Sequence, residues 1–290
     1  MSNALTILIT GATAGIGKHT ALYLHKKGHR VIATGRNESA LAALREQGLT
    51  AISMDVTSAE SIARAVESVR EITAGAGVDV LVNNAGYGLV GPLEELTDED
   101  VRAQFETNVF GLLAVTRAFL PAMRARGRGR IINLSSVGGR MVFPLGGAYH
   151  ATKFAVEAMS DALRMELKQF GIAVSVIEPG YIATEFTATT VAHVRKYQRP
   201  ESDYANAIDF VANAEQTIAK LAVGPQSVAN AIEHAATARW PRARYVAPFY
   251  NALGPWIVRL LPTALTDWFM RRAAGLYPHK RLSAATSAAS

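Results

Sequence analysis

The stretch Thr10-Gly11-Ala12-Thr13-Ala14-Gly15-Ile16-Gly17 decides the fold. It follows the apolar run Thr6–Thr10, which is typical of a strand buried on both faces, and it precedes an amphipathic stretch that continues through Lys27. Glycines at a strand-to-helix turn let the backbone approach a pyrophosphate, whose charge is met by the amides at the helix N-terminus. Glycine-rich turns also occur as packing solutions, but this one lies between a strand and a helix. We therefore predict a dinucleotide site formed by Gly11, Thr13, Gly15, Ile16 and Gly17.

Apolar, β-rich runs alternate with amphipathic stretches through residues 1–180. This alternation predicts stacked βαβ units, and therefore an α/β fold with a doubly wound parallel sheet of the Rossmann type. No linker, charge block or repeat divides the chain. We expect a single catalytic domain at 1–250 with a lid insertion at about 186–224, and a helical C-terminal extension at 251–290. The expected strands are 6–10, 31–34, 51–54, 78–82, 131–134, 174–177 and, as a seventh, 244–247.

Composition and charge restrict the possible functions. The 290 residues include no cysteine, which excludes disulfides, zinc–thiolate sites and catalytic thiols, and we expect no metal site. The net charge of +6 suggests a nucleic-acid partner. However, residues 1–238 carry 22 Lys and Arg against 23 Asp and Glu, whereas residues 239–290 carry eight against Asp267 alone. The positive excess belongs to the C-terminal extension, so we expect no nucleic-acid partner.

The hydropathy pattern bears on localisation. No apolar run approaches the ~18 residues of a membrane-spanning helix. The run Leu5–Thr10 lacks the basic region that precedes the core of a signal peptide. We therefore expect a cytoplasmic protein without a transmembrane segment.

The C-terminal extension combines aromatic residues with arginines. Leu265, Trp268 and Phe269 lie near Arg271 and Arg272, a composition that can bind an acidic membrane surface. The favoured alternative is that these helices cover the substrate cleft or a subunit interface, because the apolar stripe is short and interrupted by proline.

The end of the second expected strand indicates the cofactor. A ribose 2′-hydroxyl is usually held here by Asp or Glu, whereas a 2′-phosphate is held by Arg. The chain reads Ala33-Thr34-Gly35-Arg36-Asn37, with no carboxylate. Arg36 can bind a phosphate through two N–H groups, although a solvated loop arginine would give the same sequence. We predict NADP(H) rather than NAD(H).

Tyr149 and Lys153 lie at the start of a second long helix, and their spacing of four puts phenol and ammonium on one helix face. A free tyrosine titrates near pH ~10, and a neighbouring cation lowers its pKa toward the working range. Ser135 and Ser136 follow the strand Ile131–Leu134, where a hydroxyl can bind a substrate oxygen. Each feature alone is typical of a surface pair or a loop, but together they indicate a proton-transfer site.

From Thr6 to about Thr184 the chain resembles the short-chain dehydrogenase/reductase family. Seven motifs in the order and spacing of that family carry the resemblance, which makes chance agreement negligible. They are the Thr-Gly-x-x-x-Gly-x-Gly turn at 10–17, Asp55-Val56, Asn83-Asn84-Ala85-Gly86, Asn108, Ser136, Tyr149-x-x-x-Lys153 and Pro179-Gly180-x-Ile182-x-Thr184.

The resemblance implies an oxidoreductase that moves a hydride between a nicotinamide and a carbonyl or alcohol carbon. Tyr149 would be the general acid in reduction and the base in oxidation. Lys153 would lower the pKa of Tyr149 and hold the nicotinamide ribose. Ser136 would support the charge that develops on the substrate oxygen. Asn108 would hold a water that links Lys153 to solvent.

The resemblance also implies the other cofactor contacts. Asp55 and Val56 would meet the adenine, Asn84–Gly86 the adenosine ribose and the sheet crevice, and Ile182 and Thr184 the carboxamide. Asp55 can also be the N-cap of the following helix, and the two roles are compatible. The full expected set is Gly11, Thr13, Gly15, Ile16, Gly17, Arg36, Asp55, Val56, Asn84, Ala85, Gly86, Tyr149, Lys153, Pro179, Ile182 and Thr184.

Substrate and assembly are less constrained by the sequence. The loops expected at the nicotinamide, Tyr87–Leu96, Val137–Ala148 and Tyr181–Gly224, are mostly apolar, which favours a hydrophobic ketone or alcohol. The stretches Asp98–Arg124 and Tyr149–Phe170 carry more apolar residues than one sheet face requires. A homodimer or homotetramer could bury these additional apolar residues at a subunit interface. Burial within the monomer is the competing explanation. A non-catalytic NADP(H)-sensing regulator is the alternative function, and a non-redox relative on the same scaffold, such as an epimerase, is a third.

Overall fold

Seven parallel strands form one central sheet in the computed structural model, which describes residues 4–213 and 222–276. The strand order is β3-β2-β1-β4-β5-β6-β7, so the chain winds outward from β1 in one direction and then in the other. The expected doubly wound parallel sheet is confirmed. The strands are β1 (Thr6–Ile9), β2 (Arg30–Gly35), β3 (Thr50–Ser53), β4 (Val80–Asn83), β5 (Gly129–Leu134), β6 (Ile172–Pro179) and β7 (Arg244–Ala247).

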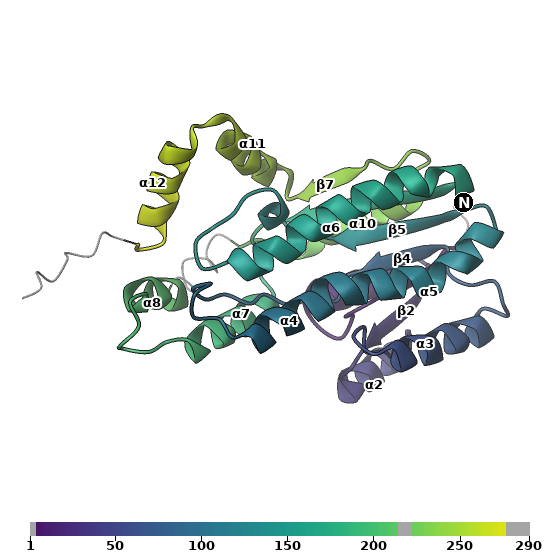
Figure 1. Cartoon of the computed structure of the whole chain (residues 1–290). Helices are drawn as coiled ribbons and strands as arrows, with labels where there is room; N and C mark the ends of the chain where they lie inside the picture. Colours follow the sequence, from purple (N-terminus) through teal and green to yellow (C-terminus); the bar gives the residue numbers. More distant parts are fainter. Residues whose placement is uncertain (1–3, 214–221, 277–290) are drawn as a thin grey trace, which may run out of the picture.

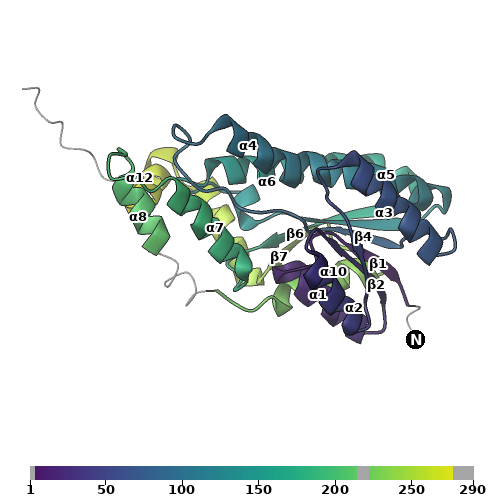
Figure 2. The ribbon, with the colours of Figure 1, turned by 90° about the horizontal axis from the view of Figure 1, so that it is seen from below.

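Helices cover both faces of the sheet (Figures 1 and 2). Because side chains alternate along a strand, each strand supplies both layers: Ile7 and Ile9 of β1 pack in one core cluster and Leu8 in the other. The first layer contains α1 (Gly15–Lys26), α2 (Glu38–Glu46) and α10 (Gln226–Thr237), and the second contains α3 (Ala59–Ile72), α5 (Leu112–Ala125) and α6 (Gly147–Glu166).

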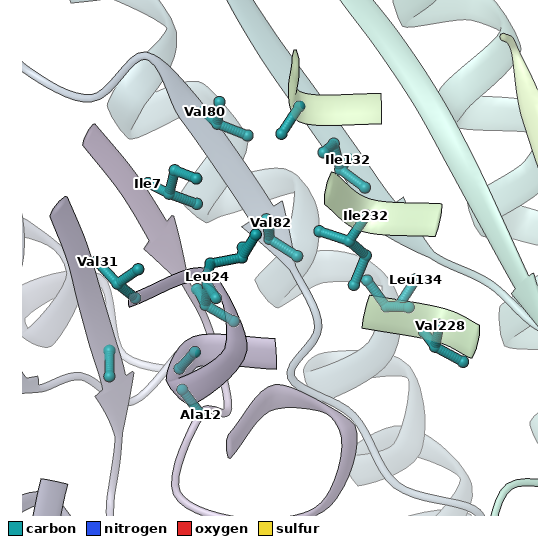
Figure 3. Close-up of a cluster of buried hydrophobic side chains, with 14 of the residues drawn as sticks. Ile7, Ala12, Leu24, Val31, Val80, Val82, Ile132, Leu134, Val228 and Ile232 are labelled. Atoms are coloured by element: carbon teal, nitrogen blue, oxygen red, sulfur yellow. The ribbon is translucent and has the colours of Figure 1, made fainter. Parts of the chain in front are cut away.

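Figure 3 shows the core cluster under the first layer. Strand valines and isoleucines meet Leu24 of α1 and Ile232 of α10, and both of these side chains are fully buried. Burying a side chain of this size contributes about 1.5–3 kcal/mol, so this cluster fixes the first helices against the carboxyl ends of the strands.

The helix expected over Asp98–Arg124 is interrupted. The chain forms α4 (Asp98–Phe105), a π-helical turn, η1 (Glu106–Gly111), and then α5. Thr97 caps α4 by accepting a hydrogen bond from the Asp100 amide at 3.2 Å. The wider turn shifts the phase of the helix, so Val115 and Phe119 are buried on the sheet while Leu113 and Leu120 are only half-buried.

Two further helical segments flank the carboxyl end of the sheet. Helix α6 begins two residues before Tyr149 and is followed by η3 (Lys168–Phe170). The region expected to be a lid contains α7 (Glu185–Lys196) and α8 (Ala205–Asn213), and its residues 214–221 lie outside the described residues.

The C-terminal extension follows β7 as η4 (Phe249–Ala252), α11 (Leu253–Leu260) and α12 (Thr263–Ala273). Figure 1 shows α11 and α12 at the edge of the molecule, beyond the end of β7. Within residues 4–213 and 222–276, no helix combines the length and the hydropathy needed to cross a bilayer.

Candidate active site

A cleft of about 620 Å³ lies at the carboxyl edge of the sheet, where the winding reverses between β1 and β4. Nearly all residues expected from the sequence line it, although they come from six different strand ends and from α6. The expected residues that line the cleft are Gly11, Thr13, Gly15, Ile16, Arg36, Asp55, Val56, Asn84, Ala85, Gly86, Ser136, Tyr149, Lys153, Pro179, Ile182 and Thr184.

Gly17 and Asn108 are the two expected residues that do not line this cleft. Gly17 faces the neighbouring strand end: a Cβ there would lie 2.4 Å from the Gly11 carbonyl oxygen and from Asn84 Nδ2. Gly17 therefore serves close packing under the turn, and its expected contact with the cofactor stays a prediction. Gly11 and Gly15, with φ of +62° and +54°, supply the left-handed conformations of the turn.

The N-terminus of α1 is built to hold an anion. No side chain caps it and its first turn carries no acidic residue. Instead, the Gly15 amide donates a hydrogen bond to Glu185 Oε2 of α7 at 3.0 Å. A carboxylate from the lid region thus occupies the place where helix amides and dipole favour negative charge. These donors fit the pyrophosphate of a dinucleotide.

The Glu185 contact leads to a prediction. Glu185→Gln lowers the Kd for NADPH by about threefold, because the pyrophosphate no longer competes with a carboxylate for the Gly15 amide. Fluorescence titration at low ionic strength measures this change. Glu201→Gln, an exposed acid between α7 and α8, removes the same charge and should leave the Kd unchanged. Weaker binding by Glu185→Gln would show that the carboxylate supports the cofactor.

Arg36 lies at the end of β2, with 75% of its side chain exposed and Nη1 3.8 Å from Asp55 Oδ2. Burial raises the pKa of the Asp55 carboxyl, but hydrogen bonds from Thr57 and the charge of Arg36 outweigh it, so the pKa lies below its ordinary value. Ser58, not Asp55, caps α3 by accepting from the Ser61 amide. The sequence-based alternative that Asp55 is the N-cap is therefore wrong.

Ser136, Tyr149 and Lys153 lie together on the other side of the cleft. Ser136 Oγ accepts from the Gly138 amide at 3.0 Å and donates to the Pro179 carbonyl at 3.4 Å. Burial raises the pKa of Tyr149 to about 12, while its hydrogen bond with Ser136 lowers it.

Lys153 differs from its expected electrostatic role. Its Nζ donates to the Leu134 carbonyl at 2.8 Å and lies 5.7 Å from the centroid of the Tyr149 ring. Burial lowers the pKa of Lys153 to about 8, although the charge of Glu157 raises it. The expected lowering of the Tyr149 pKa by Lys153 is not found, because burial of the phenol dominates.

Asn108 is buried in the π-helical turn η1. Its Oδ1 accepts from the Tyr87 amide at 3.1 Å, and its Nδ2 donates to the Tyr87 carbonyl at 3.0 Å and to Thr152 Oγ1 at 3.2 Å. The side chain therefore joins the loop after β4 to α6, one residue before Lys153. π-Helical turns frequently occur at functional sites, and this one gives Asn108 its inward direction.

Some residues that shape the cleft were not singled out from the sequence. Thr107, Glu185 and Thr189 line it. Phe186, from the loop Tyr181–Gly224 expected at the nicotinamide, also lines it, and its ring lies 5.8 Å from that of Tyr149. His150, buried behind Tyr149, accepts from the Phe143 amide at Nε2, so its Nδ1–H donates to the Gly138 carbonyl at 2.9 Å. Adjacency to Tyr149 was the only sequence signal for His150, whereas Glu185 and Thr189 fall in the expected loop Tyr181–Gly224.

A cluster of buried charges lies beneath this side of the cleft. Arg244 of β7 contacts three carboxylates: Nε lies 3.0 Å from Glu157 Oε2 and 3.4 Å from Glu178 Oε1, and Nη2 lies 2.6 Å from Asp161 Oδ2. Glu178 is fully buried, and Arg140 Nη1 lies 3.5 Å from its second oxygen. Burial and the neighbouring Glu157 raise the pKa of Glu178 to about 7. Among the described residues, no group of three or more His, Cys, Asp or Glu could hold a metal ion.

Known proteins share this arrangement. The family model described as short chain dehydrogenase matches residues 5–195. The chain belongs to the short-chain dehydrogenase/reductase family. It is therefore an oxidoreductase of the class that uses NAD(P) and acts on small molecules.

Individual members of this family resemble the chain over most of its length. It is 37% identical to an uncharacterized oxidoreductase, YbbO, of Escherichia coli, over 90% of this chain and 92% of that protein. It is 38% identical to human retinol dehydrogenase 16, over 91% of this chain and 87% of that protein. A solved serine dehydrogenase complexed with NADP+ superposes with a TM-score of 0.72 at 30% identity, covering 83% of this chain and 94% of that chain.

Proposed function

We propose that this short-chain dehydrogenase/reductase is an NADP(H)-dependent enzyme that interconverts a carbonyl compound and a secondary alcohol. The observation that carries the proposal is the convergence of Ser136, Tyr149 and Lys153 on a cleft whose opposite end is the anion-binding terminus of α1. NADPH, when bound, supplies the hydride.

The residues of the chain handle the proton and the developing charge. Tyr149 donates its phenolic proton to the substrate oxygen, and Ser136 donates a second hydrogen bond to the same oxygen. Lys153, held by the Leu134 carbonyl, holds the nicotinamide ribose when the cofactor is bound. Asn108 positions this part of α6 through Thr152. With its pKa raised to about 12, the phenol is protonated at neutral pH, which is the form that a general acid in carbonyl reduction requires.

Arg36 supports the preference for NADP(H). Arg36→Ala should raise the Kd for NADPH about 10- to 100-fold and leave the Kd for NADH nearly unchanged, because a charge-assisted hydrogen bond to the 2′-phosphate is lost. Fluorescence titrations with both cofactors measure the two constants. Arg64→Ala, on the exposed face of α3, also removes one positive charge and should change neither the Kd for NADPH nor the Kd for NADH. Equal weakening of NADH and NADPH by Arg36→Ala would contradict a role in phosphate recognition.

Apolar side chains beside Tyr149 support a hydrophobic substrate. Phe186 is 39% exposed next to the phenol, and Leu93 is 65% exposed although it packs against Gly147 at the start of α6. The similarity to human retinol dehydrogenase 16 agrees with such a substrate, whereas the serine dehydrogenase is named for a polar one.

The proposed function is tested by NADPH consumption against a panel of aryl ketones, retinal, steroid ketones and small polar ketones. We expect stoichiometric oxidation of NADPH with the hydrophobic members. A protein that binds NADPH without turning over any of them would instead be the sensing regulator. A change of substrate configuration without net NADPH consumption would indicate the non-redox alternative.

Two organisational features belong to the same proposal. We propose that residues 1–250 act as one catalytic unit, with 186–224 as its lid and 251–290 as an appended element. We also propose a homodimer or homotetramer of cytoplasmic location. Phe110 of η1 and Met165 of α6 are 54% and 66% exposed, which supports a subunit interface along these helices.

A further inference from the structure

Helices α11 and α12 each present large apolar side chains to solvent. On α11, Leu253, Trp256 and Leu260 follow the helical spacing of three to four residues and are 64%, 53% and 79% exposed. On α12, Trp268 and Phe269 are 58% and 60% exposed. Scattered apolar residues on a surface need no explanation, but two consecutive helices that each expose several large apolar side chains mark an interaction surface.

The two helices are held on the body of the protein, so their exposure does not come from detachment. Trp256 packs under the Arg140 guanidinium, and Arg140 Cζ lies 5.8 Å from the centroid of the Trp256 ring. At the other end of the pair, a Cβ at Gly275 would lie 3.3 Å from Phe210 of α8. The two helices therefore hold their exposed apolar side chains at a defined position.

The charge of this surface indicates its partner. Arg259 and Arg271 are exposed beside the stripes, and the Arg272 guanidinium lies 5.5 Å from the centroid of the Trp268 ring. The two helices together carry Arg259, Arg271 and Arg272 against a single acid, Asp267. A second copy of the chain docking here about a two-fold axis would bring arginines against arginines. Anionic lipid headgroups complement this charge, and aromatic and leucine side chains enter the headgroup–acyl boundary.

We propose that the outward face of α11 and α12 docks on a membrane surface that contains anionic phospholipid. The sequence favoured the opposite explanation because the stripe of each helix is short. In the structure α12 follows α11 after two residues, and the described residues of the chain leave the large apolar side chains of both helices exposed. Arg140, which contacts Trp256, also contacts Glu178 beneath the cleft, so docking would place this side of the cleft next to the lipid.

The test is flotation of the full chain with vesicles of phosphatidylcholine alone and with vesicles that also contain phosphatidylglycerol. We expect binding to the anionic vesicles only, and a decrease as salt is added. Trp268→Ser and Leu260→Ser should each weaken binding about tenfold, because each removes an apolar side chain from the boundary region.

Trp240→Ser is the matched control. Trp240 is 78% exposed and lies against Arg239 with a guanidinium-to-ring distance of 5.6 Å, so it reproduces the Trp268–Arg272 pair outside the two helices. This variant should bind vesicles like the parent, and circular dichroism should show that all three variants are folded. Equal binding to both kinds of vesicle, no binding to either, or a dimer that Leu260→Ser dissociates in light scattering would each overturn the proposal.

Discussion

Replacing Tyr149 by phenylalanine lowers kcat for carbonyl reduction by roughly 10³-fold, in the range that positioned acid catalysts contribute. The change removes the hydroxyl that hydrogen-bonds with Ser136 and keeps the ring that packs against Phe186. The Kd for NADPH should therefore stay close to that of the parent, and the loss should appear in kcat. Steady-state oxidation of NADPH gives the rate, and fluorescence titration gives the Kd.

Tyr250→Phe provides a comparison for this prediction. Tyr250 lies in η4, is 55% exposed and does not line the cleft. Tyr250→Phe removes the same hydroxyl group away from the cleft, so the kcat of this variant should equal that of the parent. If Tyr149→Phe retains the turnover of the parent, the proton comes from another group and the proposed assignment fails. If Tyr149→Phe also loses NADPH binding, the hydroxyl supports the cofactor site and not the proton transfer alone.

The strands could be predicted closely from the sequence because their pattern is local. A strand buried on both faces must be an uninterrupted apolar run, and Arg244–Ala247 was expected with the bounds that the structure has. The cleft residues could be predicted for a related reason. The carboxyl ends of parallel strands meet at one edge, so motifs that follow different strands converge there.

The remaining features depend on contacts between distant parts of the chain. Gly17 is needed because Asn84, from another strand end, packs against it. Glu185 reaches the Gly15 amide across 170 residues, which no local pattern reports. The π-helical turn around Asn108 adds one residue to a helix whose apolar period continues on both sides, so the sequence shows a single helix. The pKa of Tyr149 depends on burial, which the spacing to Lys153 does not measure.

Arg244→Met should lower the free energy of unfolding by about 3 kcal/mol at about pH 8, because removing one partner of a buried ion pair leaves the other charge uncompensated. Arg244 contacts Glu157, Asp161 and the fully buried Glu178, so its loss leaves Arg140 as the cation paired with Glu178 among the described residues. Methionine fills much of the volume of arginine, so the decrease in the free energy of unfolding reports mainly on the lost charge. Arg70→Met, which breaks an exposed pair with Glu67, should change the free energy by about 0.5 kcal/mol or less.

The pH dependence of this deficit separates charge from packing. The folded pKa of Glu178, raised to about 7 from an ordinary 4.5, means that the folded state binds more protons than the unfolded state between these values. The contribution of Glu178 to stability is therefore present below the ordinary pKa and is lost as pH rises through about 7. Without Arg244 the pKa of Glu178 rises further, so the deficit of Arg244→Met should be larger at about pH 8 than at about pH 5, as urea unfolding at both pH values can measure. A deficit of the same size at both pH values would assign the loss to packing at β7 and not to the buried carboxylates.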